Sequence, residues 1–284
     1  RLDGEPFQDY ATGRANFQGK EGSHVDAEDG WLWKNPVEHG PADSVLGVYG
    51  TYAAGQSRTC YYWIAAAQSI QEAQDLNEYV VRKSPEHLIK TTSNFWHAWV
   101  NAYKWDFDGL SQEHVTLFKR SLLNMRAAVD KDGGIIASAD SDMLQYGLDT
   151  YSYVWPRDAA YVAMALDSAG EMNTAQRFFS FARDVLFREG YFLHKYLPDK
   201  SLGSSWHPWI KDGIPQLPIQ EDETALVIYA LRKHYERSKD LDFLEEIYNP
   251  LVEKAANFMV RYRDPATFLP EPSYDLWERK RGVS

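Results

Sequence analysis

The sequence has a single cysteine, Cys60, and it lacks both an excess of positive charge and any long apolar run. One cysteine cannot form a disulfide within the chain, and its apolar neighbours in "TCYYWIAAA" predict a buried structural thiol. A formal net charge of −11 argues against nucleic acid as a partner, because phosphate binding needs clustered Lys and Arg. No apolar run reaches the roughly 20 residues of a membrane-spanning helix, so no membrane partner is expected.

Aromatic residues, by contrast, are abundant, with 10 Trp and 18 Tyr among the 284 residues. Their flat apolar faces with a polar edge suit cores, interfaces and sugar-binding platforms alike. Hydrophobic residues make up 44% of the chain and charged residues 25%, which is ordinary for a globular protein. The length allows two modest domains or one large one.

The first 68 residues predict strands and loops. Short apolar runs at 44–55 and 58–67 are rich in Val, Tyr and Trp and are bounded by turn residues. One pair of strands buries too little surface to stand alone, so this region must pack on something or be the remnant of a larger sheet. Helical patterns begin at Ser69, and Ser84 followed by Pro85 predicts the cap and the first residue of a second helix.

From about residue 110 onward, the apolar residues recur at the 3- and 4-residue spacing of helices. Five helices are predicted, the first capped by Ser111, and the connections between them alternate in length. Short joints near 170 and 239 predict antiparallel hairpins, whereas the connections at 131–156, 190–220 and 263 onward are long. In such an array the long loops gather at one end, which predicts a ring of helical hairpins with functional loops on one rim.

The first long loop ends in "YVWPRD", which holds Trp155, Arg157 and Asp158. Arg supplies a planar fork of donors and Asp supplies acceptors, so with an aromatic face they can grip the neighbouring hydroxyl groups of a sugar. The residues alone leave an alternative open, in which Arg157 and Asp158 are a helix-start ion pair and Trp155 belongs to the core.

The other two long loops carry Trp206 and Trp209 before the acidic stretch that begins at Glu221, and Trp277 beside Glu278. Acids also favour the first turn of any helix, so Glu221 has a structural explanation as well. A carboxyl held against a Trp in an apolar cleft has a raised pKa and can act as a general acid, although a surface carboxylate beside a packed Trp is the simpler alternative. Without His or Cys at ligand spacing, neither a metal nor a cofactor is expected.

Three motifs occur in this order and at these separations: "YSYVWPRDAAYVAMAL", "SSWHPWIKDGIPQLPIQEDETALVIYAL" and "LPEPSYDLWERKRG". Over nearly the whole chain, the sequence resembles glycoside hydrolase family 15, the glucoamylase and glucodextranase family. The resemblance implies a mainly α fold in three parts. These are the C-terminal part of a β-sandwich domain at 1–68, linker helices at 69–109, and the N-terminal part of an (α/α)6 barrel at 110–284.

The resemblance also implies roles for the residues of the three loops. Glu278 would be the general acid, while Arg157 and Asp158 would bind the hydroxyls of the non-reducing terminal glucose. Trp155 would line the same subsite, and Trp206, Trp209 and Glu221 would lie near the leaving group. Trp277 would be a further substrate-binding residue. The family inverts configuration, so its second carboxylate acts as a base that activates water.

Two departures from the family pattern bear on function. Many members follow the catalytic Glu with a second Glu, whereas here the next residue is Arg279. The family's general base lies downstream of residue 284, so the chain is expected to be a fragment that is inactive alone and that needs its C-terminal half as a partner. The expected substrate is an α-glucan or oligosaccharide. The alternatives are a trehalose-type α-glucoside hydrolase and a non-catalytic carbohydrate-binding or structural half-barrel.

Overall fold

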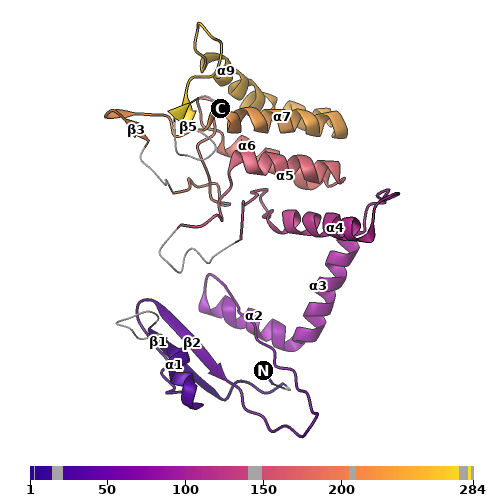
Figure 1. Ribbon diagram of the computed structural model, residues 1–284, viewed down its shortest axis with the longest axis vertical. Helices are drawn as coiled ribbons and strands as arrows, with labels where there is room; N and C mark the ends of the chain where they lie inside the picture. Colours follow the sequence, from indigo (N-terminus) through magenta and orange to yellow (C-terminus); the bar gives the residue numbers. More distant parts are fainter. Residues whose placement is uncertain (3, 15–21, 140–148, 205–208, 275–280, 283–284) are drawn as a thin grey trace. The chain divides into compact units, whose positions relative to one another are not determined.

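The computed structural model describes residues 1–284 except 3, 15–21, 140–148, 205–208, 275–280 and 283–284 (Figure 1). The chain divides into two compact units, Arg1–Phe95 and Trp96–Ser284, which we describe one at a time. Among the described residues, no helix has both the length and the apolar character that crossing a membrane requires. The three-part division at residues 68 and 109 remains a prediction.

The first unit contains a two-stranded antiparallel sheet of β1 (Asp9–Arg14) and β2 (Ala42–Gly47), paired from Asp9 opposite Gly47 to Arg14 opposite Ala42. Between the strands lie the short helices α1 (Ser23–Asp26) and η1 (Ala27–Asp29). The sequence predicted strand at 44–55, of which β2 covers only the start, and it gave no signal for β1.

The predicted strand at 58–67 is wrong. In the described part of this stretch, one isolated bridge joins Cys60 to Leu2. A strand needs a neighbour for its backbone donors and acceptors. Beyond that bridge, the run pairs with no strand among the residues of the unit that the structure describes. The prediction of a buried Cys60 is also wrong, because the residue is exposed.

Two helices follow, and both begin where the sequence predicted. α2 (Ile70–Lys83) starts after Ser69, whose Oγ accepts a hydrogen bond from the Glu72 amide at 3.2 Å. α3 (Pro85–Val100) starts after Ser84, whose Oγ accepts from the His87 amide at 3.3 Å. Each hydroxyl satisfies one of the amide groups that the first helical turn leaves without a partner.

The second unit is built from the predicted helical hairpins. α5 (Pro156–Ser168) is joined to α6 (Met172–Val185) through Gly170, whose φ of 94° suits a residue without a side chain. α7 (Glu221–Ser238) is joined to α8 (Leu241–Ile247) through Lys239 and Asp240. The predicted fifth helix is α8, η3 and α9 in direct succession. Its middle is a π-helix that contains Pro250, which has no amide hydrogen to donate. The helices are α4 (Gln112–Ala127), α5 (Pro156–Ser168), α6 (Met172–Val185), α7 (Glu221–Ser238), α8 (Leu241–Ile247), η3 (Tyr248–Glu253) and α9 (Lys254–Arg261).

The core of this unit lies around α5, which packs against both α6 and α7 (Figure 1). α5 contributes small buried residues, among them Ala159, Ala160 and Ala163, so that its neighbours approach closely. Phe178, Phe179 and Phe181 of α6 and Val227, Ala230 and Leu231 of α7 fill the space between the helices. A buried pair, His234 Nδ1 and Asp167 Oδ1 at 2.8 Å, ties α7 to α5 within this core.

The long connections meet at one end of the helices, as the sequence predicted. The starts of α5 and α7 touch through Arg157 and Asp222, and Ser273, which follows α9, contacts the start of α7. These connections contain two antiparallel pairs of two-residue strands: β3 (Ile210–Lys211) with β4 (Ile214–Pro215), and β5 (Ser273–Tyr274) with β6 (Arg281–Gly282). The described part of the chain is mainly helical, and its second unit is an array of helical hairpins.

Candidate active site

Arg157 links the start of α5 to the start of α7. Pro156 opens α5, a position where its missing amide hydrogen costs nothing, and Arg157 follows in the first turn. Its Nη1 donates to Gln220 Oε1 at 3.1 Å and to the two carboxylate oxygens of Asp222 at 3.2 and 3.1 Å. Glu223 Oε1 lies 3.9 Å from the same nitrogen. The guanidinium is therefore held by α7 more than by its neighbour Asp158, whose Oδ2 lies 4.0 Å from Arg157 Nε.

The charges around Arg157 keep it protonated. Burial by itself would lower the pKa of Arg157, but the negative charges of Glu223 and Asp222 outweigh that effect and raise it. The side chain is only 16% exposed and Glu223 is fully buried, so these charges interact in a largely dry setting. A fixed guanidinium of this kind can bind hydroxyl or carboxylate oxygens without changing its own charge.

Asp158 is more open to solvent than Arg157. Half of its side chain is exposed, yet desolvation raises the pKa of the carboxyl, and the Arg157 charge offsets this only in part. Asp158 borders a hollow of about 400 Å³ between α4 and α5 whose other walls are mostly apolar. Its oxygens are therefore accessible acceptors beside a fixed donor.

Trp155 lies in a cluster of aromatic side chains from two of the long loops. It is buried, and its Nε1 donates to His194 Nε2 at 3.3 Å. The Trp209 ring packs against the His194 ring, with 5.4 Å between their centroids. The structure thus brings two predicted substrate-binding residues, Trp155 and Trp209, to the same cluster through a histidine that the sequence analysis did not single out.

Lys195 is a second residue of this cluster that sequence reasoning missed. Its side chain is 1% exposed, and its Nζ lies 4.4 Å from the ring centroid of Tyr153 and 5.2 Å from that of Trp155. Asp149 Oδ2 stands 3.6 Å from this nitrogen. The one signal for the pair was the polar dipeptide His194-Lys195 inside the apolar run "YFLHKYL", where two polar residues in a row are unusual for a buried segment.

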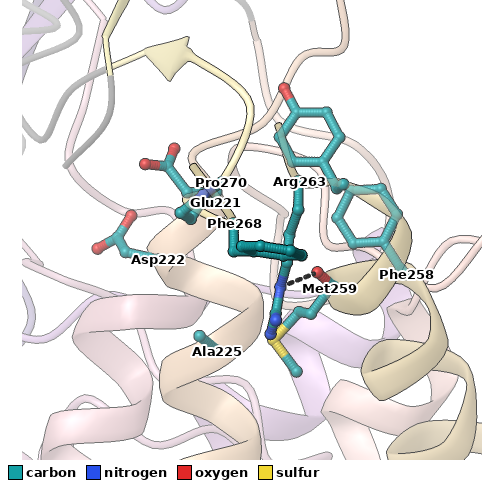
Figure 2. A pocket seen from close by; sticks show the side chains of 9 residues that line it. Glu221, Asp222, Ala225, Phe258, Met259, Arg263, Phe268 and Pro270 are labelled. Carbon is teal, nitrogen blue, oxygen red and sulfur yellow. Dashed lines mark hydrogen bonds between the residues drawn. The ribbon is translucent and has the colours of Figure 1, made fainter. Parts of the chain in front are cut away.

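Glu221 begins α7 and lines a pocket of about 420 Å³ between α7, α9 and the turn that follows α9. Figure 2 shows the carboxyl groups of Glu221 and Asp222 on one side of this pocket, with Phe258 and Met259 opposite. Phe268 and Arg263 also line the pocket. Asp222 also holds Arg157, so the pocket and the guanidinium share a residue.

Ser273 connects the third long loop to the same place. Its Oγ accepts a hydrogen bond from the Glu221 amide at 3.1 Å, and the residue is buried. This amide belongs to the first turn of α7, which has no intrahelical acceptor for it.

Three predicted site residues, Trp206, Trp277 and Glu278, lie outside the described residues. The remaining five, Trp155, Arg157, Asp158, Trp209 and Glu221, are described above, and their predicted roles stay predictions. Within the described part of the chain, no three His, Cys, Asp or Glu side chains stand close enough to hold a metal ion.

Comparison with known proteins gives three findings. The sequence profile of "Glycosyl hydrolases family 15" matches residues 112–197, a stretch that holds Trp155, Arg157 and Asp158. The "Uncharacterized glycosyl hydrolase MJ1610" of Methanocaldococcus jannaschii is 29% identical over 208 residues. A crystal structure of a bacterial glucoamylase, solved with acarbose, superposes with a TM-score of 0.66 at 18% identity and covers 98% of this chain.

The chain is thus similar to glycoside hydrolase family 15. At 18% identity, the likeness to the bacterial glucoamylase concerns the fold alone, and it confirms the predicted one, which is mainly helical with part of an (α/α)6 barrel. The match to the Methanocaldococcus jannaschii relative includes 72% of this chain but only 30% of the relative's length. The chain likewise spans 37% of the length of the bacterial glucoamylase. The profile match includes His194 and Lys195 as well, and it stops before the pocket at Glu221.

Proposed function

We propose that the protein containing this chain is a glycoside hydrolase that releases glucose from the non-reducing ends of α-glucans with inversion of configuration. The observation that carries the proposal is the fixed Arg157 guanidinium, held by Gln220 and Asp222 beside the accessible carboxyl of Asp158. A sugar ring presents neighbouring hydroxyls that both accept and donate, and this pair supplies a donor and an acceptor side by side. The similarity to proteins named glycosyl hydrolases supports the same conclusion.

In the proposed reaction, Glu278 protonates the glycosidic oxygen while the bond between that oxygen and the anomeric carbon breaks. A water molecule attacks the anomeric carbon from the opposite face and loses a proton to a carboxylate base. Inverting enzymes hold their two carboxyl groups about 6.5–9.5 Å apart to leave room for this water. Arg157 and Asp158 hold the non-reducing terminal glucose, whose anomeric carbon the water attacks. The pocket at Glu221 and Asp222 binds the sugars on the leaving-group side.

The proposal is tested by incubating the complete protein with maltooligosaccharides, isomaltooligosaccharides and trehalose and by following the products with proton NMR. Glucose that first appears as the β-anomer supports inverting hydrolysis of an α-glucoside, and the preferred substrate identifies the linkage. Rapid cleavage of trehalose alone would favour a trehalose-type hydrolase. If no substrate is cleaved while oligosaccharides still bind, the protein is a carbohydrate-binding protein instead.

The segment of residues 1–284 by itself should release no glucose. This expectation rests on the family resemblance, which assigns the general base to a position beyond residue 284, and on the 30% and 37% of the relatives' lengths that the segment spans. The measurement is a glucose assay of the purified segment beside the complete protein. Glucose release by the segment, in proportion to its concentration, would contradict the expectation.

Asp158→Asn should impair binding of substrate without impairing stability. Losing one charged partner of a sugar hydroxyl should lower kcat/KM by about 10²–10³-fold. Because the folded state raises the pKa of Asp158 above its ordinary 3.8, ionisation of this carboxyl weakens the fold as pH rises through that interval. The variant should therefore be at least as stable as the wild type at pH 7, and this difference should vanish below about pH 3.8.

Thermal unfolding at pH 7 and pH 3.5, together with kcat/KM, checks both parts. A variant that keeps wild-type kcat/KM would exclude Asp158 from the site. A variant that loses both activity and stability at pH 7 would mean that Asp158 holds the fold rather than the substrate.

A further inference from the structure

We propose that Asp149 is a positioning residue that fixes the Trp155 ring for substrate by joining the first and second long loops. This inference rests on the proposed function, in which Trp155 lines the glucose site.

Each oxygen of the Asp149 carboxylate binds a different part of the site. Oδ1 accepts from the Tyr153 hydroxyl at 2.9 Å and from the Thr150 amide at 2.8 Å. Oδ2 accepts from the Ser204 hydroxyl and faces Lys195 Nζ at 3.6 Å. Tyr153 belongs to the first long loop, whereas Lys195 and Ser204 belong to the second. One carboxylate therefore connects segments that are about fifty residues apart in the sequence.

The contact with Lys195 adds a charge to this connection. A buried ammonium is costly unless a negative charge and good contacts compensate for it. Lys195 is 1% exposed, and it receives compensation from the Asp149 carboxylate and from the faces of two aromatic rings, Tyr153 and Trp155. Removing the negative charge of Asp149 while keeping its shape should therefore displace Lys195 and the rings that it touches.

Trp155 is the residue on which these contacts converge. The Tyr153 ring meets it edge-on with 5.8 Å between centroids, Lys195 lies over it, and His194 accepts from its indole nitrogen. Asp149 does not itself contact Trp155 through any hydrogen bond found among the described residues. It acts through Tyr153 and Lys195, which is the arrangement expected of a residue that supports a binding platform.

The test uses the complete protein labelled with 5-fluorotryptophan, in which the Trp155 resonance is assigned with a Trp155→Phe variant. Asp149→Asn keeps the size of the side chain and removes its charge. The Trp155 fluorine resonance should shift or broaden, and kcat/KM on maltooligosaccharides should fall at least tenfold. Asp199→Asn is the matched control, because Asp199 is an exposed carboxylate of the second loop that bonds only to nearby Ser201 in the described structure. Its kcat/KM should stay within twofold of the wild type.

Tyr153→Phe provides a second, gentler variant in case Asp149→Asn does not fold. It removes one hydroxyl from a ring that stays packed, and it should move the same resonance in the same direction and lower kcat/KM by two- to tenfold. An unmoved Trp155 resonance in either folded variant would overturn the proposal, whatever happens to activity. Because the resonance is measured without substrate, this outcome is distinct from a failure of the proposed function, which would appear as an inactive wild-type protein.

Discussion

In the complete protein, Glu278→Gln should lower kcat on maltooligosaccharides by about 10²–10⁴-fold while leaving KM nearly unchanged. Glutamine has almost the same shape as a protonated glutamic acid, so contacts made by the bound substrate persist. The amide, however, cannot give a proton to the glycosidic oxygen, and the sugar alkoxide is a poor leaving group without one. An effect on kcat alone is the signature of an interaction made only in the transition state.

A substrate that needs no acid separates proton donation from every other role of Glu278. Fluoride leaves glucose without prior protonation, so α-glucosyl fluoride should be hydrolysed by the Glu278→Gln protein within about tenfold of the wild-type rate. Equal losses on both substrates would show that Glu278 shapes the site and does not donate the proton. Glu271→Gln is the matched control, because Glu271 lies in the same segment and is only partly buried. It should retain wild-type rates on both substrates. An unaffected Glu278→Gln protein would contradict the role of Glu278 as the general acid.

The parts of the fold that the sequence predicted are those encoded within a few residues. Ser69, Ser84 and Ser111 each accept from an amide three residues further on, so the cap and its partner lie in the same short stretch. Helix spacing and the short joints at Gly170 and Lys239 are likewise local. Together they fix which helices form hairpins, and hence on which end the long loops gather.

Pairing between distant segments was not predictable in the same way. The sequence placed Arg157 beside Asp158, yet the strongest contacts of Arg157 are with Gln220 and Asp222, more than sixty residues away. These contacts exist because the small residues of α5 let α7 pack closely, and the depth of that packing is a property of the assembled core. The exposed Cys60 shows the converse, since an apolar run predicts burial only where another element is present to cover it.

Burial of Lys195 illustrates why part of the site was missed. A lysine predicts a solvated surface in nearly every context, and only the assembled cluster of Tyr153, Trp155 and Asp149 makes its burial possible. The sequence alone likewise could not decide whether Trp155 belongs to the core. The ring is buried, but it is buried among polar partners at the end of the helices where the loops meet.

Arg157→Met should lower the free energy of unfolding by about 3–5 kcal/mol, the cost of removing one partner from a buried ion pair. Methionine fills much of the same volume, so the loss reflects charge rather than a cavity. The variant leaves Glu223, which is fully buried, and Asp222 without the guanidinium that faces them. Urea unfolding, followed by the circular dichroism of the helices, measures the change.

Arg183→Met is the matched control for charge and size. Arg183 also pairs with two acids, Asp184 and Glu246, but these three side chains are 26%, 33% and 60% exposed. The loss should therefore not exceed about 1 kcal/mol. Adding Glu223→Gln to Arg157→Met removes the buried charge that the first change left behind, and it should restore at least about 1 kcal/mol. If Arg157→Met proves no more destabilising than Arg183→Met, the guanidinium is not part of a buried charge network. The proposed function would then lose the observation that carries it, which is a fixed guanidinium beside the carboxyl of Asp158.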